Sequence, residues 1–134
     1  MDIAKCESLK AELSAQARPV VPIARYFDGN DDLGSIGCNL LEHPGIARFR
    51  EVLVGLTKRP DVEAVYALIA ELDPGKGLWP FTDTIVVFGN MKAEDLRQAV
   101  GSLAPDEVGP ARDFKLPEEL LSKHSAPALA VWWD

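Results

Sequence analysis

DVEAVYALIAEL at residues 61–72 and DTIVVFG at residues 83–89 decide the fold, and DPGKG at residues 73–77 begins the connection between them. The run 83–89 is rich in β-branched residues and is typical of a strand, while Pro and Gly in the connection are typical of a turn. Residues 61–72 alternate as in a strand buried on both faces, but their apolar spacing and alanines also fit a helix. We predict that the two runs are strands of one hairpin. The helical alternative gives a mainly helical α+β domain with a three-stranded sheet.

Upstream of this hairpin the sequence predicts two helices and one strand. Apolar residues recur at helical spacing over residues 2–17 and again from Pro44 to Lys58, and a proline closely follows each run. Residues 20–27 are rich in β-branched and aromatic residues and predict a strand. Pro22 lacks a backbone donor, so this strand is expected at a sheet edge or at a bulge.

Downstream of the hairpin, residues 92–103 predict a short helix and residues 128–133 predict a final strand. The intervening residues 104–126 predict a long loop with one helical turn at Pro117 to Leu121. The resulting order matches the split β-α-β pattern. We therefore predict a single α+β domain over residues 1–134, a ferredoxin-like βαββαβ sandwich with an extra N-terminal helix. The first helix or the long loop is expected to cover the open sheet face.

The charge balance argues against two classes of partner. The chain has 14 Lys and Arg against 21 Asp and Glu, a net charge of −7, and no basic cluster of the kind that binds phosphates. Nucleic acid and anionic membranes are therefore not expected partners. No basic segment followed by an apolar run begins the sequence, and its two cysteines do not make a disulfide scaffold. A reducing, cytoplasmic location is expected.

An acidic, turn-rich loop runs from Asp28 to Asn39. Asp28, Asn30 and Asp32 stand at alternate positions, as the first three oxygen ligands of a calcium loop do. Leu33 then replaces the required glycine, and Asn39 replaces the bidentate glutamate. We predict a solvated turn stabilised by local hydrogen bonds. Weak cation binding by Asp28, Asn30 and Asp32 is the alternative.

Cys38, Glu42 and His43 form the other group with chemical potential. Their spacing, C-x₃-E-H, matches no zinc pattern, and nothing in the sequence supplies an orienting partner for a Cys–His nucleophile. Serine hydrolase motifs are missing as well. We predict no catalytic residue and no cofactor, and an enzyme using Cys38, Glu42 and His43 remains an alternative.

These observations favour a non-enzymatic domain that binds another protein. One form of this hypothesis is a small acidic inhibitor or immunity-type protein that masks a basic partner. The expected contact residues are Asp28, Asp31 and Asp32, with Trp79 and Trp133 as aromatic anchors, because Trp dominates binding hot spots. A homodimer is also compatible with an open sheet face or edge.

Four short motifs resemble a family of small, uncharacterised bacterial proteins. They are GSIGCN at 34–39, WPF-x-D at 79–83, DEVG at 106–109 and VWWD at 131–134. The resemblance implies a bacterial, cytoplasmic protein. It carries no activity and no site residue to this chain.

Overall fold

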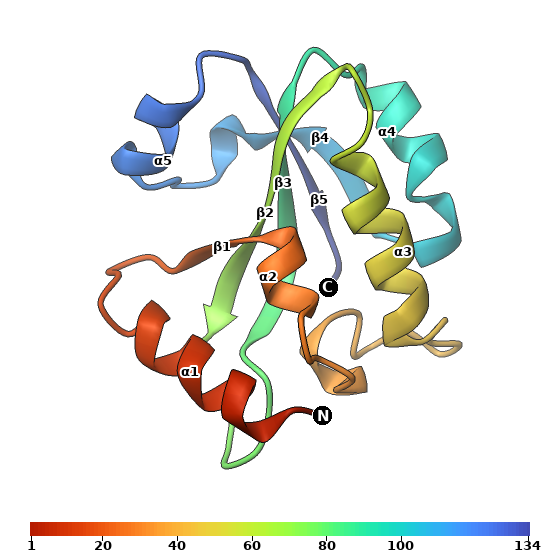
Figure 1. The fold of residues 1–134 in the computed structure, drawn as a ribbon. Helices are drawn as coiled ribbons and strands as arrows, with labels where there is room; N and C mark the ends of the chain where they lie inside the picture. Colours follow the sequence, from red (N-terminus) through yellow and green to blue (C-terminus); the bar gives the residue numbers. More distant parts are fainter.

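Five strands form one antiparallel sheet in the order β1-β2-β3-β5-β4 (Figure 1). The structure is a computed structural model that describes residues 1–134, the side chain of Asp113 excepted. The strands are β1 (Val20–Pro22), β2 (Val62–Glu71), β3 (Phe81–Gly89), β4 (Glu107–Pro110) and β5 (Ala128–Trp132). The helices are α1 (Ile3–Leu13), α2 (Ile23–Phe27), α3 (Ile46–Leu56), α4 (Ala93–Ala99) and α5 (Glu118–Lys123). The α+β class is confirmed.

The central hairpin of β2 and β3 has the predicted form. Val65 pairs with Val87 and Tyr66 pairs with Val86, so residues 61–72 adopt the strand and not the helical alternative. Successive residues of a strand point to opposite faces. Val65 accordingly joins the core on one face of the sheet, while Tyr66 packs against a separate apolar cluster on the other.

Two layers of unequal thickness cover the sheet. Apolar side chains of α1, α2, α3 and α4 share one core with the first face of the sheet. The other face is covered by a thinner layer built from residues 111–123, which contain a 3-10 helix (Ala111–Asp113) and α5. Figure 1 shows α5 on the opposite side of the sheet from α3 and α4. Of the two segments expected to cover this second face, the long loop therefore does so and the first helix does not.

The predicted strand at residues 20–27 is corrected by the structure. Only Val20–Pro22 is strand, and Ile23–Phe27 is the helix α2. Pro22 stands directly before α2 with a φ of −55°. Because proline has no amide proton, it cannot donate a further hydrogen bond to the sheet, and the strand ends there. The edge position predicted for Pro22 is confirmed, because β1 is the first strand of the sheet.

Residues 104–126 are more ordered than the predicted loop. They contain the edge strand β4, in which Val108 pairs with Val131, as well as α5. Arg97 of α4 donates from Nη2 to the Val108 carbonyl oxygen at 3.0 Å, at the outer edge of β4.

The ferredoxin-like detail of the prediction is not confirmed. In the structure β1 is the direct antiparallel neighbour of β2. In a split β-α-β unit, a third strand lies between the two strands that the helix connects.

Candidate binding surface

The acidic loop folds back onto the start of α1. Asp28 Oδ1 accepts a hydrogen bond from Lys5 Nζ at 2.7 Å, and Asp31 Oδ2 accepts one from the Met1 amino group at 2.7 Å. The hydrogen bond from Lys5 lowers the pKa of the Asp28 carboxyl group below its usual value. Both carboxylates stay substantially exposed, and both already lie beside a cation of this chain.

The side chains of Asn30 and Asp32 stabilise the loop through hydrogen bonds. Asp32 accepts from the Gly34 amide through Oδ1 at 2.9 Å and from the Trp79 amide through Oδ2 at 3.0 Å. Asn30 is buried and donates to Ser35 Oγ at 3.0 Å. Asn30 Oδ1 in turn accepts from the Asp32 amide at 2.9 Å, so the side chains of Asp28, Asn30 and Asp32 are each engaged in hydrogen bonds within the chain. Over the described residues, no three His, Cys, Asp or Glu side chains are placed to hold a metal ion.

Trp79 and Trp133 do not lie on the surface, which corrects their predicted role as contact residues. Their exposed fractions are 0% and 4%. The Trp133 indole donates from Nε1 to the Leu103 carbonyl oxygen at 2.9 Å. The centroid of its ring lies 5.6 Å from that of the Phe49 ring. Both rings belong to the core on the helical side of the sheet, so the sequence predicted the wrong apolar residues for a contact surface.

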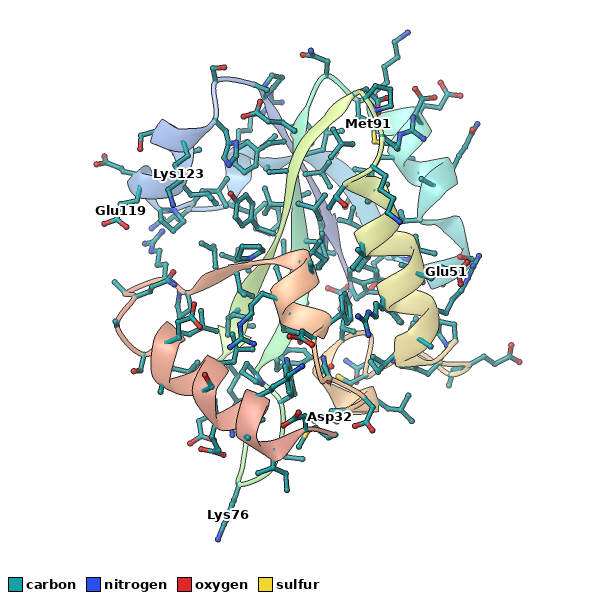
Figure 2. The ribbon with its side chains drawn as sticks, in the orientation of Figure 1. Asp32, Glu51, Lys76, Met91, Glu119 and Lys123 are labelled. Carbon is teal, nitrogen blue, oxygen red and sulfur yellow. The ribbon has the colours of Figure 1, made fainter. Side chains whose placement is uncertain are left out.

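The exposed apolar groups beside the acidic loop are aliphatic. Ile3, Leu33 and Leu78 are 63%, 56% and 46% exposed. The segments that carry them are hydrogen-bonded to one another, because Cys6 Sγ donates to the Leu78 carbonyl oxygen at 3.4 Å and Asp32 accepts from the Trp79 amide. Figure 2 shows Asp32 and Lys76 at this end of the molecule, with Lys76 pointing away from the protein.

We call this region the N-terminal end surface. Its residues are Ile3, Asp28, Asp31, Asp32, Leu33 and Leu78. Sequence reasoning missed the three aliphatic members. A usable signal existed for Leu33 and Leu78, since each lies in a turn-rich loop in which no helical or strand pattern accounts for a large apolar residue.

Cys38, Glu42 and His43 are not joined into a reactive cluster. Gly45 donates its amide to His43 Nδ1 at 2.9 Å, so Nε2 carries the proton and donates to the Ile36 carbonyl oxygen at 2.8 Å. The imidazole also packs 5.1 Å from Phe49. Both ring nitrogens are therefore engaged in holding the loop, and neither is available to accept a proton from the exposed Cys38 thiol.

A carboxylate–imidazole–hydroxyl chain lies on the other face of the sheet. His124 Nδ1 is 2.6 Å from Glu63 Oε1, and His124 Nε2 is 2.8 Å from Tyr66 Oη. The same ring stacks on Phe88 with centroids 4.5 Å apart. His124 is 61 positions from Glu63 and 58 from Tyr66 along the sequence, which offered no signal of their meeting.

The series carboxylate–imidazole–hydroxyl resembles the catalytic triad of a hydrolase in its order, but the hydroxyl group here has different chemistry. Burial, followed by the Glu63 charge, raises the pKa of Tyr66, so its hydroxyl stays protonated and is a poor nucleophile. Five cavities among the described residues, each of about 420–490 Å³, have none of these three side chains in their linings. The hydrogen bonds that join His124 to Glu63 and Tyr66 therefore hold the end of α5 against β2.

Stability is predicted to fall in alkali because both tyrosines have raised pKa values. Tyr26 is fully buried, with its hydroxyl near the carbonyl oxygens of Ser35 (2.8 Å) and Pro80 (2.7 Å), and burial is the main cause of its raised pKa. Below about pH 10, the pKa of an unfolded tyrosine, both states are protonated and the full stability is present. Above it the unfolded phenols ionise before the native ones, so the free energy of unfolding decreases.

Urea unfolding at pH 8.5 and pH 10.5 measures this effect. We expect a clear loss of stability between the two values in the wild type and a smaller loss in Tyr26→Phe. The absorbance at 295 nm at pH 10.5 should also show less phenolate in the native protein than in the urea-unfolded chain. Equal phenolate absorbance in the two states at that pH would contradict the prediction.

Comparison with known proteins supplies a family but no function. None of the described helices combines the length and the apolar character that a membrane-spanning helix needs. No curated protein and no solved structure matches the chain. One family model matches residues 4–132, which is nearly the whole sequence. The chain therefore belongs to the uncharacterized protein YfbO family.

Proposed function

We propose that this protein is a non-enzymatic domain that binds a basic partner protein through the N-terminal end surface. The observation that carries the proposal is the exposure of Ile3, Leu33 and Leu78 on mutually bonded segments beside three aspartates. Aliphatic side chains grouped at a surface and rimmed by charges are typical of protein-binding sites.

The aspartates suit a cationic partner. Asp28 and Asp31 pair with Lys5 and the Met1 amino group, but such exposed ion pairs contribute only about 0–1 kcal/mol each. An arginine of a partner can therefore replace or join these cations at little cost, and it can bind a carboxylate in a bidentate manner. The net charge of −7 adds attraction at longer range. An acidic inhibitor or immunity-type protein has these properties.

A bacterial cytoplasm is the setting that we propose for this binding. Both cysteines are free thiols in the structure, Cys6 buried and Cys38 exposed, which suits a reducing compartment. Burial raises the pKa of the Cys6 thiol, so its reactive thiolate form is disfavoured.

Affinity capture from a bacterial lysate, followed by binding measurements with the purified partner, tests the proposal. The bait is compared with the double variant Leu33→Lys/Leu78→Lys and with Leu41→Lys, a matched change at a fully exposed leucine of another loop. We expect one basic protein to be retained by the wild type and by Leu41→Lys. Its affinity should fall at least about tenfold in the double variant and should fall with added salt.

The variants must keep the wild-type circular dichroism spectrum, which is expected because both leucines are exposed. Equal affinity of the partner for the wild type and the double variant would remove this surface as the binding site. Failure to capture any basic protein at low salt would count against the function itself.

A further inference from the structure

A cavity of about 430 Å³ opens in the thin layer that covers the second face of the sheet. Phe88 of β3 lines it, together with Phe114 and Leu116 of the covering segment, Leu121 of α5, and Pro127 before β5. Its volume lies within the range of small-molecule sites, and its walls come from four separate segments of the chain. None of these residues belongs to the N-terminal end surface.

The lining combines apolar side chains with one cation. Among the described side chains that line the cavity, Arg112 is charged and the others are apolar. Glu118 and Glu119, in the first turn of α5, are exposed and do not line the cavity. A guanidinium group beside an apolar hollow favours a ligand with an apolar body and a carboxylate or sulfonate group, which Arg can bind with two hydrogen bonds.

Leu121 shows that the hollow is not closed by the chain itself. It is 48% exposed, whereas its neighbour Leu120 is buried against the sheet. An exposed leucine at the edge of an apolar hollow gains from any apolar ligand that covers it. The buried Phe88 forms the floor, and the His124 ring that stacks on it is hydrogen-bonded to Glu63 and Tyr66.

We infer that this cavity binds a small organic anion, an aromatic or aliphatic acid whose apolar part lies against Phe114, Leu116 and Leu121 and whose charged group meets Arg112. The site is separate from the proposed protein-binding surface. Loss of one is therefore not expected to affect the other.

Titration of the full chain with 8-anilinonaphthalene-1-sulfonate tests the site, followed by competition with octanoate and with the uncharged octanol. We expect saturable binding at a single site and displacement by octanoate at lower concentration than by octanol. Arg112→Gln should weaken octanoate about tenfold while changing octanol by less than about twofold, since only the former carries a charge. Leu121→Asp should weaken all three ligands by tenfold or more.

Two controls separate site binding from dye adsorption. Arg48→Gln removes an arginine remote from this cavity, and Leu33→Lys/Leu78→Lys alters the other surface; neither should change the titration. A retained near-ultraviolet circular dichroism spectrum excludes dye binding by a loosened core. The inference is overturned if binding does not saturate, if Leu121→Asp binds as the wild type does, or if Arg112→Gln weakens octanoate and octanol equally. Equal weakening of octanoate and octanol would identify the cavity as a binding site for an uncharged apolar group.

Discussion

Gly89→Ala is expected to lower the free energy of unfolding by about 3–5 kcal/mol, near the upper end of single-residue effects. Gly89 ends β3 with a φ of +147°, a conformation that costs a residue with a side chain about 1–3 kcal/mol. An added Cβ would also overlap the Asp61 carbonyl oxygen and approach the Val62 Cα to 2.9 Å. These atoms cannot move aside easily, because Asn90 donates its amide to the same Asp61 oxygen at 2.9 Å and Val62 pairs with Gly89.

Gly55→Ala provides the matched control for this prediction. Gly55 lies in α3, and an added Cβ there meets no atom within 4 Å. Alanine is favoured over glycine in a helix, so this variant should be stabilised by up to about 1 kcal/mol. Urea unfolding of both variants gives the comparison. If Gly89→Ala remains within about 1 kcal/mol of the wild type, the close approach of β2 and β3 at this end is wrong.

Trp133→Phe is expected to cost about 1–2 kcal/mol more than Trp79→Phe, although both rings are buried and the change of size is the same. Trp133 Nε1 donates to the carbonyl oxygen of the buried Leu103, and phenylalanine would leave that oxygen without this donor. Trp79 Nε1 is buried without a hydrogen-bond partner among the described atoms. Its replacement therefore removes a donor that is already unsatisfied, so that only packing is lost.

The two variants are compared by urea unfolding, with Trp132→Phe as reference. Trp132 is half-buried, faces the thin layer and packs 5.3 Å from Phe114, so its replacement should have the smallest effect of the three. A cost for Trp79→Phe equal to or above that for Trp133→Phe would show that the Trp79 indole makes a hydrogen bond in solution, for example to a buried water.

The parts of the fold that sequence predicted are those with a strong local pattern. The β-branched run at residues 83–89 and the proline at position 22 each determine local backbone geometry, and the structure confirms both predictions. The strand β4 escaped prediction because Gly109 and Pro110 both disfavour strands, and its pairing with β5 supplies what the local sequence does not. The helix α2 escaped because five residues are too short for a helical pattern to outweigh β-branched neighbours.

The candidate surface was predictable in charge but not in its apolar contacts. Asp28 and Asp31 lie on the surface beside cations, as an acidic loop suggests. Asp32 instead binds the amide of Trp79, a contact across 47 positions that only the folded chain creates. Tryptophans were expected at the surface because of their general frequency in interfaces, whereas here the two predicted anchors fill the core and aliphatic residues are exposed in their place.

Both edge strands of the sheet hinder pairing with a strand of a second molecule. At one margin β1 has only three residues and ends in Pro22, which offers no amide proton to an incoming chain. At the other, the guanidinium of Arg97 already occupies the Val108 carbonyl oxygen and places a positive charge where a further strand would have to lie. Growth of a continuous ladder from molecule to molecule, the first step of fibril formation, is hindered at both ends.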